Sequence, residues 1–426
     1  MPHDHGLGED LRSSPSRRRV LVAVILLIAL ATAVGLAASW PQGDVQRSDE
    51  RLGLITEVYG AEVASIVRGP CAGTIAADDV PCARTRFRLT AGPDRGSIER
   101  IELPESPTSP DLEAGDSVVL SYDPKADPGF QYQYADRQRR PLLLWLTILF
   151  VLVVIALGRW RGATALIGLG ASLIVLLVYV LPALVEGTSP VLVAVVGSAA
   201  IAYLALYFAH GLRLMTTVAL LGTLAALALT VGLATLFTEL AELTGFTSEE
   251  AILVLVGTQN LDLSGIVLAG MVLGALGALD DVTVTQASAV WELRLANPAM
   301  SRWELYRAGL RIGRDHVAST VNTLALAYAG AALPLLLLFV LAHQSLGTIA
   351  NSEIVSTEII RTLVGSIGLV AAVPLTTWLA TEFVSQPRGR GREVRIPRRK
   401  TRIREAATDA VLPEAADRDE TDFWTR

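Results

Sequence analysis

Lysine is almost absent from this chain, since only Lys125 and Lys400 occur among its 426 residues. With so little lysine, no G-x-x-x-x-G-K-[ST] phosphate loop is present, which excludes a P-loop ATPase within the chain. Cysteine is equally scarce, because Cys71 and Cys82 are the only two, and no histidine lies near them. Two thiols alone make a poor zinc site, so a disulfide is the preferred interpretation if this segment lies outside the cytoplasm. No cofactor or metal site is predicted.

Apolar residues, in contrast, make up 51% of the chain, which is too many for an ordinary soluble enzyme. Eight apolar runs predict membrane spans, at residues 20–40, 142–157, 164–185, 190–208, 215–237, 264–291, 317–341 and 359–381. The predicted fold is therefore a multi-pass α-helical membrane bundle of about eight spans. The first run also has features of a signal peptide, but it is long and lacks a clean A-x-A exit. These two features favour an uncleaved span.

Residues 41–140 are the only sizeable polar segment between spans. The stretches LGLITEVYG, RTRFRLTAG, GSIERIELP and EAGDSVVLSYDP alternate apolar and polar residues between Gly, Pro and Asp turns. This pattern predicts a small β-rich domain, of the OB-like barrel type, between spans 1 and 2. The domain shows no catalytic constellation. Its basic and aromatic residues are scattered, so nucleic acid is not an expected partner.

Arginine near the span ends predicts the orientation of the chain. Arg17–Arg19, Arg159, Arg161, Arg213 and the arginines of residues 294–314 alternate with loops that lack Lys and Arg, at 186–189, 238–250 and 342–357. The positive-inside rule then places both termini in the cytoplasm and the β-rich domain outside. The expected parts are a tail at 1–19, the first span at 20–40, the external domain at 41–140, seven spans within 141–385, and a basic then acidic tail at 386–426. The basic part of that last tail has two open interpretations, contact with anionic lipid or a solvated tail without a partner.

Two adjacent carboxylates, Asp280 and Asp281, interrupt a stretch that is otherwise uncharged from Leu263 to Trp291. The midpoint of this stretch is near Gly277, which places both aspartates close to the middle of a span. A competing register ends the span at Leu279 and puts the aspartates in the cytoplasm, but it leaves the uncharged residues 282–291 exposed. We expect the central register, in which desolvation and mutual repulsion favour protonated carboxyls.

Helical spacing predicts one stripe that contains Asp281. Residues of this stripe recur every three or four positions: Gly270, Gly274, Gly277, Asp281, Thr285, Ser288 and Glu292. We expect the small half of the stripe to allow close helix packing and the polar half to form a path, with Asp280 about 100° away. In the next span Thr320, Asn322 and Thr323 are candidate partners of the aspartates, and His316 is a candidate relay. Proton or ion coupling is the preferred role, and a permanently hydrogen-bonded pair that holds helices together is the alternative.

The segments GMVLGALGALDDVTVTQASAVWEL and AGLRIGRDHVASTVNTLALAYAGAALPLLLLF strongly resemble the YibE/F family of bacterial membrane proteins, as do EAGDSVVLSYDP and YADRQRRPLLLWL. The resemblance covers roughly residues 50–385 and implies a bacterial plasma-membrane location. A weaker likeness is to half of a resistance-nodulation-division transporter, through Gly277-x-x-Asp280-Asp281, Glu292 and the polar residues at 319–323. That spacing departs by one residue from the transporter motif, and no intramembrane lysine is present. The likeness implies proton coupling by the aspartate pair.

Three functions follow as hypotheses. The first is a transporter or export component driven by the proton gradient, whose substrate is unknown and whose external domain binds substrate or a partner. The second is a membrane scaffold or sensor whose external domain reports to the basic tail. The third, an intramembrane aspartyl protease, is disfavoured because the only other aspartate in a span is Asp262 and no G-x-G-D occurs. The chain is therefore not expected to be an enzyme. The bilayer is its expected surrounding, and a homodimer is possible.

Overall fold

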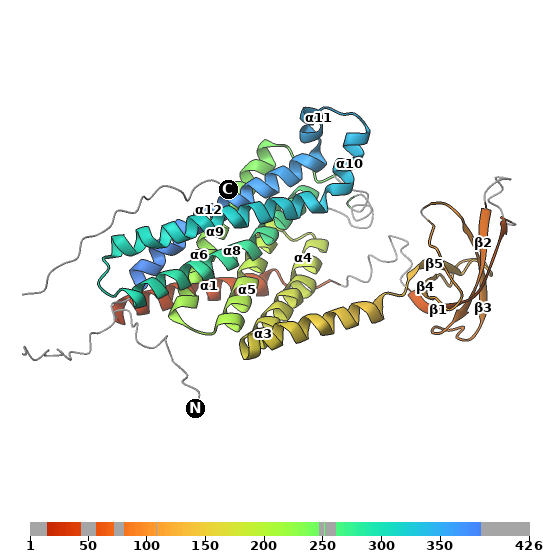
Figure 1. The fold of residues 1–426 in the computed structure, drawn as a ribbon, viewed down its shortest axis with the longest axis horizontal. Coiled ribbons are helices and arrows are strands. Elements are labelled where there is room, and N and C mark those ends of the chain that lie inside the picture. The colour runs from red at the N-terminus through yellow and green to blue at the C-terminus, as the bar shows by residue number, and fades with distance from the viewer. Residues whose placement is uncertain are drawn as a thin grey trace, which may run out of the picture. The chain divides into compact units, whose positions relative to one another are not determined.

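The computed structural model describes residues 15–43, 57–71, 81–107, 109–246, 251 and 261–384. Most of the predicted N-terminal tail and all of the predicted C-terminal tail lie outside these residues. Five strands and a set of long helices make up the described part (Figure 1).

The polar segment forms one antiparallel five-stranded sheet. Its strands are β1 (Glu57–Pro70), β2 (Pro81–Leu89), β3 (Ile98–Pro104), β4 (Ser117–Tyr122) and β5 (Tyr132–Arg137), in the order β3-β2-β1-β4-β5. The long strand β1 pairs with both β2 and β4, and the edge strands β3 and β5 approach each other, so the sheet curls into a half-barrel. Phe87, Val118 and Leu120 are fully buried inside it. The predicted β-rich domain is confirmed, and the prediction missed β5.

A disulfide joins Cys71 to Cys82, as predicted from the sequence, with the two Cα atoms 5.0 Å apart. It closes the connection between β1 and β2 at the point where Gly69 pairs with Cys82 in the sheet. The bond therefore fixes the loop end of a hairpin whose strands are already hydrogen-bonded.

The remaining described chain is helical. Its elements are α1 (Pro15–Ala38), α3 (Arg140–Val175), the π-helical turn η1 (Leu176–Val180), α4 (Leu181–Val185), α5 (Pro190–His210), α6 (Leu214–Leu240), α8 (Leu263–Ala296), α9 (Arg302–Ala331), α10 (Leu333–Leu341), α11 (Leu346–Asn351) and α12 (Glu353–Phe383). Six helices among the described residues are long and apolar enough to cross a membrane, with α3 to α4 counted as one. There are seven if α9 and α10, bent by 62° at their junction, form one span.

The long stretch from α3 to α4 is broken at Arg159, which has φ 52° and ψ −133° inside an otherwise helical run. A side chain at Gly162 would collide with the carbonyl oxygen of Val154, so the chain folds back on itself there. Figure 1 shows the two arms of α3 running beside each other. These arms correspond to the predicted spans at 142–157 and 164–185. The fold is therefore a helical membrane protein with a β-rich domain, as expected.

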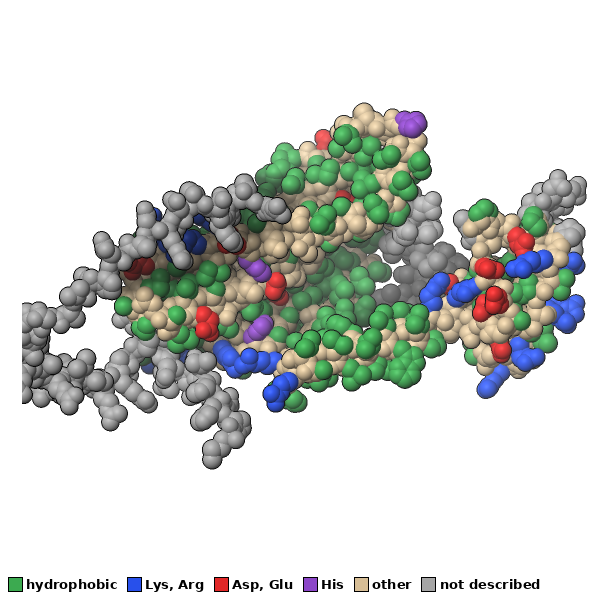
Figure 2. All heavy atoms as spheres, in the orientation of Figure 1, with side chains coloured by type: hydrophobic (Ala, Val, Ile, Leu, Met, Phe, Trp, Pro, Cys, Tyr) green, Lys and Arg blue, Asp and Glu red, His purple; other side chains and the backbone are tan. Residues whose placement is uncertain are grey.

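The helix α8 lies at the centre of the helical part, because it packs against α5, α6, α9 and α12. Its buried residues, including Met271, Val272 and Leu279, form the main core with α5, α6 and α12. The outer helices expose large apolar side chains, such as Leu142, Trp145 and Leu149 on α3. Figure 2 shows apolar side chains over the helices, while charged ones gather over the strands and at the helix ends. Such a surface suits lipid rather than water.

Candidate functional site

The helix that carries the two aspartates is long and well defined at its start. Asp262 caps it, with its side chain accepting a hydrogen bond from the backbone N–H of Gly265 at 2.9 Å. Asp262, which sequence reasoning weighed as a protease residue, therefore has a capping role. The helix has 34 residues, so it is about 51 Å long at 1.5 Å per residue. Asp280 and Asp281 are the first two residues of its second half, directly after the midpoint.

The two aspartates face different surroundings although they are adjacent. Asp280 points toward α6, where the hydroxyl of Thr223 lies beside its carboxyl group. The Oδ1 atom of Asp280 is buried and has no hydrogen-bond partner among the described residues. Asp281 is exposed, and its Oδ2 lies 3.9 Å from Nε2 of His316 on α9. One carboxyl group is thus enclosed between helices while its neighbour lies on an open face.

That open face is the predicted stripe. Six members of the stripe are exposed and Ser288 is half-buried, the exposed ones being Gly270, Gly274, Gly277, Asp281, Thr285 and Glu292. The helices that pack on α8 cover its other sides, and Figure 2 shows this side of the molecule hollowed between α9 and α3. We expected the stripe to lie against other helices of the bundle, and it does so only in part. Gly274 is in close contact, since an added Cβ would lie 2.9 Å from the hydroxyl of Tyr328, whereas Gly277 faces open space.

The predicted hydrogen-bond partners on α9 do not contact the aspartates. Thr320 and Thr323 donate to backbone carbonyls of their own helix, at His316 and Ser319, and Asn322 is exposed. They lie four to seven residues beyond His316, which is about 6 to 10 Å further along α9. His316, the candidate relay, is the residue that reaches Asp281. Thr285 likewise donates to the backbone carbonyl of Asp281 in its own helix, at 2.8 Å.

Sequence reasoning missed the polar contacts that join the helices around Asp280. The hydroxyls of Thr223 and Thr283 lie 2.6 Å apart and link α6 to α8. One turn further along α8, the buried amide of Gln286 donates to the carbonyl of Gly309 at 2.8 Å and to the hydroxyl of Thr377 at 2.7 Å. This amide therefore joins α8 to both α9 and α12. Gln286 stands out in the sequence as a polar residue in the apolar run. It was missed because it does not lie on the helix face that contains the predicted stripe.

A second charged group inside the helices was also missed. Arg361 on α12 forms an ion pair with Glu358 at 2.7 Å, and both side chains are largely buried, with exposed fractions of 24% and 30%. Its guanidinium carbon lies 5.9 Å from the ring centre of Tyr328 on α9. The sequence signal was the single arginine within the last apolar run.

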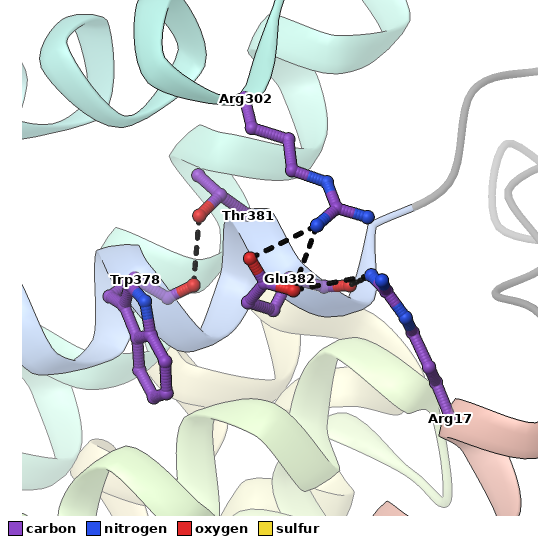
Figure 3. A network of polar contacts seen from close by, with 5 residues as sticks. All are labelled: Arg17, Arg302, Trp378, Thr381 and Glu382. Carbon is purple, nitrogen blue, oxygen red and sulfur yellow. Dashed lines mark hydrogen bonds and ion pairs between the residues drawn. The ribbon is translucent and has the colours of Figure 1, made fainter.

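A third cluster ties three helices together at the end of the bundle where α1 begins. The carboxylate of Glu382 on α12 pairs with Arg17 of α1 at 3.2 Å and with Arg302 of α9 at 3.0 Å (Figure 3). Arg17 also donates to the backbone carbonyl of Glu382 at 3.0 Å. All three side chains are partly exposed, so this contact belongs to the rim of the bundle rather than to its interior.

The half-barrel contains a cavity of about 260 Å³ between β1, β2, β3 and residues 103–112. Its lining includes Ile66, Leu103 and the buried Thr85, whose hydroxyl has no partner among the described residues. Arg68 lines the same cavity and pairs with Glu105 and Asp111 on its rim. Within the described parts of the chain, no group of three or more His, Cys, Asp or Glu side chains is placed to hold a metal ion.

Comparison with known proteins finds a family match for the helical part of the chain. No curated protein and no solved structure matches the chain. The family described as YibE/F-like protein matches residues 146–386, which is more than half of the chain and includes every helix from the second arm of α3 to α12. The weaker likeness to half of a resistance-nodulation-division transporter stays a prediction. The resemblance to the YibE/F family is confirmed, and the chain belongs to the YibE/F-like family.

Proposed function

We propose that this protein is a transporter or export component driven by the proton gradient, and that Asp280 and Asp281 carry the coupling protons. The observation behind this proposal is the contrast between an enclosed carboxyl with an unpartnered oxygen and an adjacent carboxyl on an open face. In this proposal the chain crosses a bacterial plasma membrane eight times, with the two arms of α3 as separate spans. Both termini are cytoplasmic and the half-barrel is external.

The chemistry of the pair suits proton exchange. An ionised carboxylate in a low-dielectric interior is unfavourable, so the enclosed Asp280 is driven toward its neutral form. Protonation of Asp280 removes the charge from this enclosed group, and the hydroxyl of Thr223 lies beside the carboxyl in either form. Asp281 and His316 lie on the open face and supply a place where a proton arrives or leaves.

The decisive experiment uses proteoliposomes that hold a pH-sensitive dye and an imposed pH gradient. Proton movement is measured with and without a small-molecule extract of the cells as the source of substrate. We expect extract-dependent proton movement for the wild type and its loss in D280N, D281N and the double variant. The matched control is D315N, which makes the same chemical change at an exposed aspartate of α9 beside His316. It should retain proton movement.

The proposal is wrong if the double variant folds and still moves protons as the wild type does. If the double variant fails to fold, D281N alone decides, because Asp281 is exposed and its substitution leaves the buried contacts in place. Folding is checked by the thermal unfolding midpoint of the purified full chain.

The cluster around Glu382 favours the second hypothesis, a scaffold or sensor. It connects α1, which leads to the half-barrel, with α12, which leads to the arginine-rich tail. A signal from an external domain to a tail needs such a link. In that case E382Q changes how the tail is protected from protease when the half-barrel is occupied, while D280N and D281N leave this readout unchanged. For a proton-coupled transporter, D280N and D281N abolish proton movement, whereas E382Q leaves the protection of the tail unchanged.

A further inference from the structure

The ion pair inside the helices is the strongest feature that the aspartate mechanism does not use. Arg361 lies eight residues after the start of α12, and Glu358 lies one turn earlier on the same helix. A charged side chain within a span is unfavourable by several kcal/mol unless it has a partner or a function. Glu358 satisfies part of this requirement, because its carboxylate accepts a single hydrogen bond from Nη1 of Arg361.

The guanidinium has more hydrogen-bonding capacity than Glu358 uses. An arginine side chain presents five N–H donors, and the Nε of Arg361 is buried without a partner among the described residues. Its Nη2 lies 3.8 Å from the position that a Cβ would take at Gly270, so this nitrogen borders the exposed face of α8. Donors that are held in place but not used by the protein are a feature of ligand sites.

The glycines of α8 leave the room that this site needs. At Gly274 an added Cβ would lie 2.9 Å from the hydroxyl of Tyr328, which is tighter than side chains tolerate. Tyr328 in turn places its ring 5.9 Å from the guanidinium carbon of Arg361. Gly270 and Gly274 therefore leave room for an arginine of α12 and a tyrosine of α9 at the edge of the open face.

From this geometry we propose that Arg361 and Tyr328 form a binding site for an anionic group, a carboxylate or a phosphate, on the first half of α8. The planar guanidinium fork matches both groups with two parallel hydrogen bonds. The phenol contributes one more donor and an apolar ring face for the body of the ligand. Glu358 holds the guanidinium in place when the site is empty and competes with the ligand for Nη1.

The site has a defined place relative to the aspartates. Gly270 and Asp281 are eleven residues apart on the same exposed face, which is about 16 Å along the helix. An anion at Arg361 therefore does not touch the proton-carrying pair, although both border the same exposed face of α8. That the anion is a transported substrate rests on the proposed function. That Arg361 and Tyr328 bind an anion does not depend on it.

The test measures binding without transport. The full chain is placed in nanodiscs of zwitterionic lipid, and its thermal unfolding midpoint is followed as succinate or inorganic phosphate is added. Tetramethylammonium chloride at matched ionic strength serves as the cation control. We expect a saturable upward shift with succinate or phosphate and none with the control. E358Q should reach saturation at lower anion concentration, because the competing carboxylate is removed.

Matched variants locate the effect. G274A should lose the anion-dependent shift, because it displaces Tyr328, whereas G277A, one turn away and facing open space, should keep it. R361Q leaves Glu358 buried without its partner and is prone to misfolding, so the double variant E358Q/R361Q is used to remove the guanidinium, and it should show no shift. D280N should bind the anion as the wild type does. Failure of proton coupling is thereby separated from failure of this site.

A second arm replaces part of the zwitterionic lipid by phosphatidylglycerol, without soluble anion. If stabilisation that depends on Arg361 appears only in this arm, the anionic site is supported and the ligand is a lipid headgroup rather than a soluble substrate. The site is refuted if neither arm stabilises the wild type or E358Q. It is also refuted if E358Q/R361Q responds as the wild type does.

Discussion

Asp281 on α8 and His316 on α9 face each other on the open side of the bundle, with Oδ2 and Nε2 3.9 Å apart. The two side chains are exposed to 67% and 41%, which weakens their attraction through solvent screening, although the Nε2 atom of His316 is itself buried. We predict that H316Q changes the free energy of unfolding by less than about 1 kcal/mol while it lowers proton movement in the proteoliposome assay. Denaturant unfolding of the purified chain measures the first quantity. A large loss of stability, or normal proton movement, would contradict a relay role for His316.

A larger change in the free energy of unfolding is expected for substitutions around the enclosed carboxyl of Asp280. Thr223 is fully buried and places its hydroxyl beside both Asp280 and Thr283. The isosteric change T223V keeps the volume but removes a hydrogen-bond partner from a buried polar group, so we predict a loss of about 1–3 kcal/mol in the free energy of unfolding. T285V is the matched control, because Thr285 is exposed and bonds only to its own helix. It should change stability by about 0.5 kcal/mol or less.

The contrast between these residues shows what the sequence predicts well. Apolar runs locate the helices, and alternating residues locate four of five strands, because both signals come from local periodicity. The strand β5, YQYADR in the sequence, was missed because its apolar positions are mainly tyrosines among polar residues. The disulfide was predictable because two cysteines have only one pairing.

The surroundings of the aspartates were harder to predict, because they depend on which helices pack together. Periodicity correctly placed Asp281 on a stripe with Thr285 and Glu292, but it did not show that this stripe is exposed. It also directed attention away from Asp280, which contacts Thr223 on a helix about sixty residues earlier. The sequence shows Arg361 as an arginine within an apolar run. That it lies beside Tyr328 of another helix could be learned only from the fold.

The close packing of α6 against α12 can be tested with one destabilising substitution and a second substitution that compensates for it. A methyl group at Gly368 would collide with the hydroxyl of Thr230, which is fully buried on α6. We predict that G368A lowers the free energy of unfolding by about 1–3 kcal/mol through overpacking. The double variant T230A/G368A should recover part of this loss, because it removes the colliding atom. G232A, where an added Cβ meets no neighbour, is the control. Equal stability of G368A and G232A would contradict this close helix contact.

The disulfide has a direct chemical test. Reduction and alkylation of the intact chain should increase its mass by two alkyl groups, and alkylation without reduction should leave the mass unchanged. Cys71 and Cys82 are separated by 11 positions, so the loop-entropy model gives a stabilisation of about 3 kcal/mol or less. We expect C71S/C82S to speed hydrogen exchange in β1 and β2 but not in α8. Alkylation without prior reduction would show that the thiols are free.

The half-barrel provides the pH prediction. The hydroxyl of Tyr132, which is buried, donates to Asp94 at 2.8 Å, and burial followed by this hydrogen bond raises the pKa of Tyr132 above its ordinary value. Because the folded pKa is the higher one, the contribution to stability is complete below the unfolded pKa of about 10. It is lost as the pH rises through the folded value. We therefore predict late ionisation of Tyr132, together with alkaline loss of protection in β4 and β5.

The measurement compares wild type with Y132F, since the pKa of Tyr59 is also raised, by its hydrogen bond to Glu57, and that of Tyr134 by burial. Phenylalanine keeps the ring that packs 4.8 Å from the ring of Tyr122 but has no proton to lose. The difference between the two tyrosinate absorbance titrations should be a single step above the ordinary tyrosine range. Hydrogen exchange in β5 of Y132F should depend less on alkaline pH than in the wild type. A difference step at the ordinary pKa would mean that Tyr132 is solvated and that Asp94 does not hold its proton.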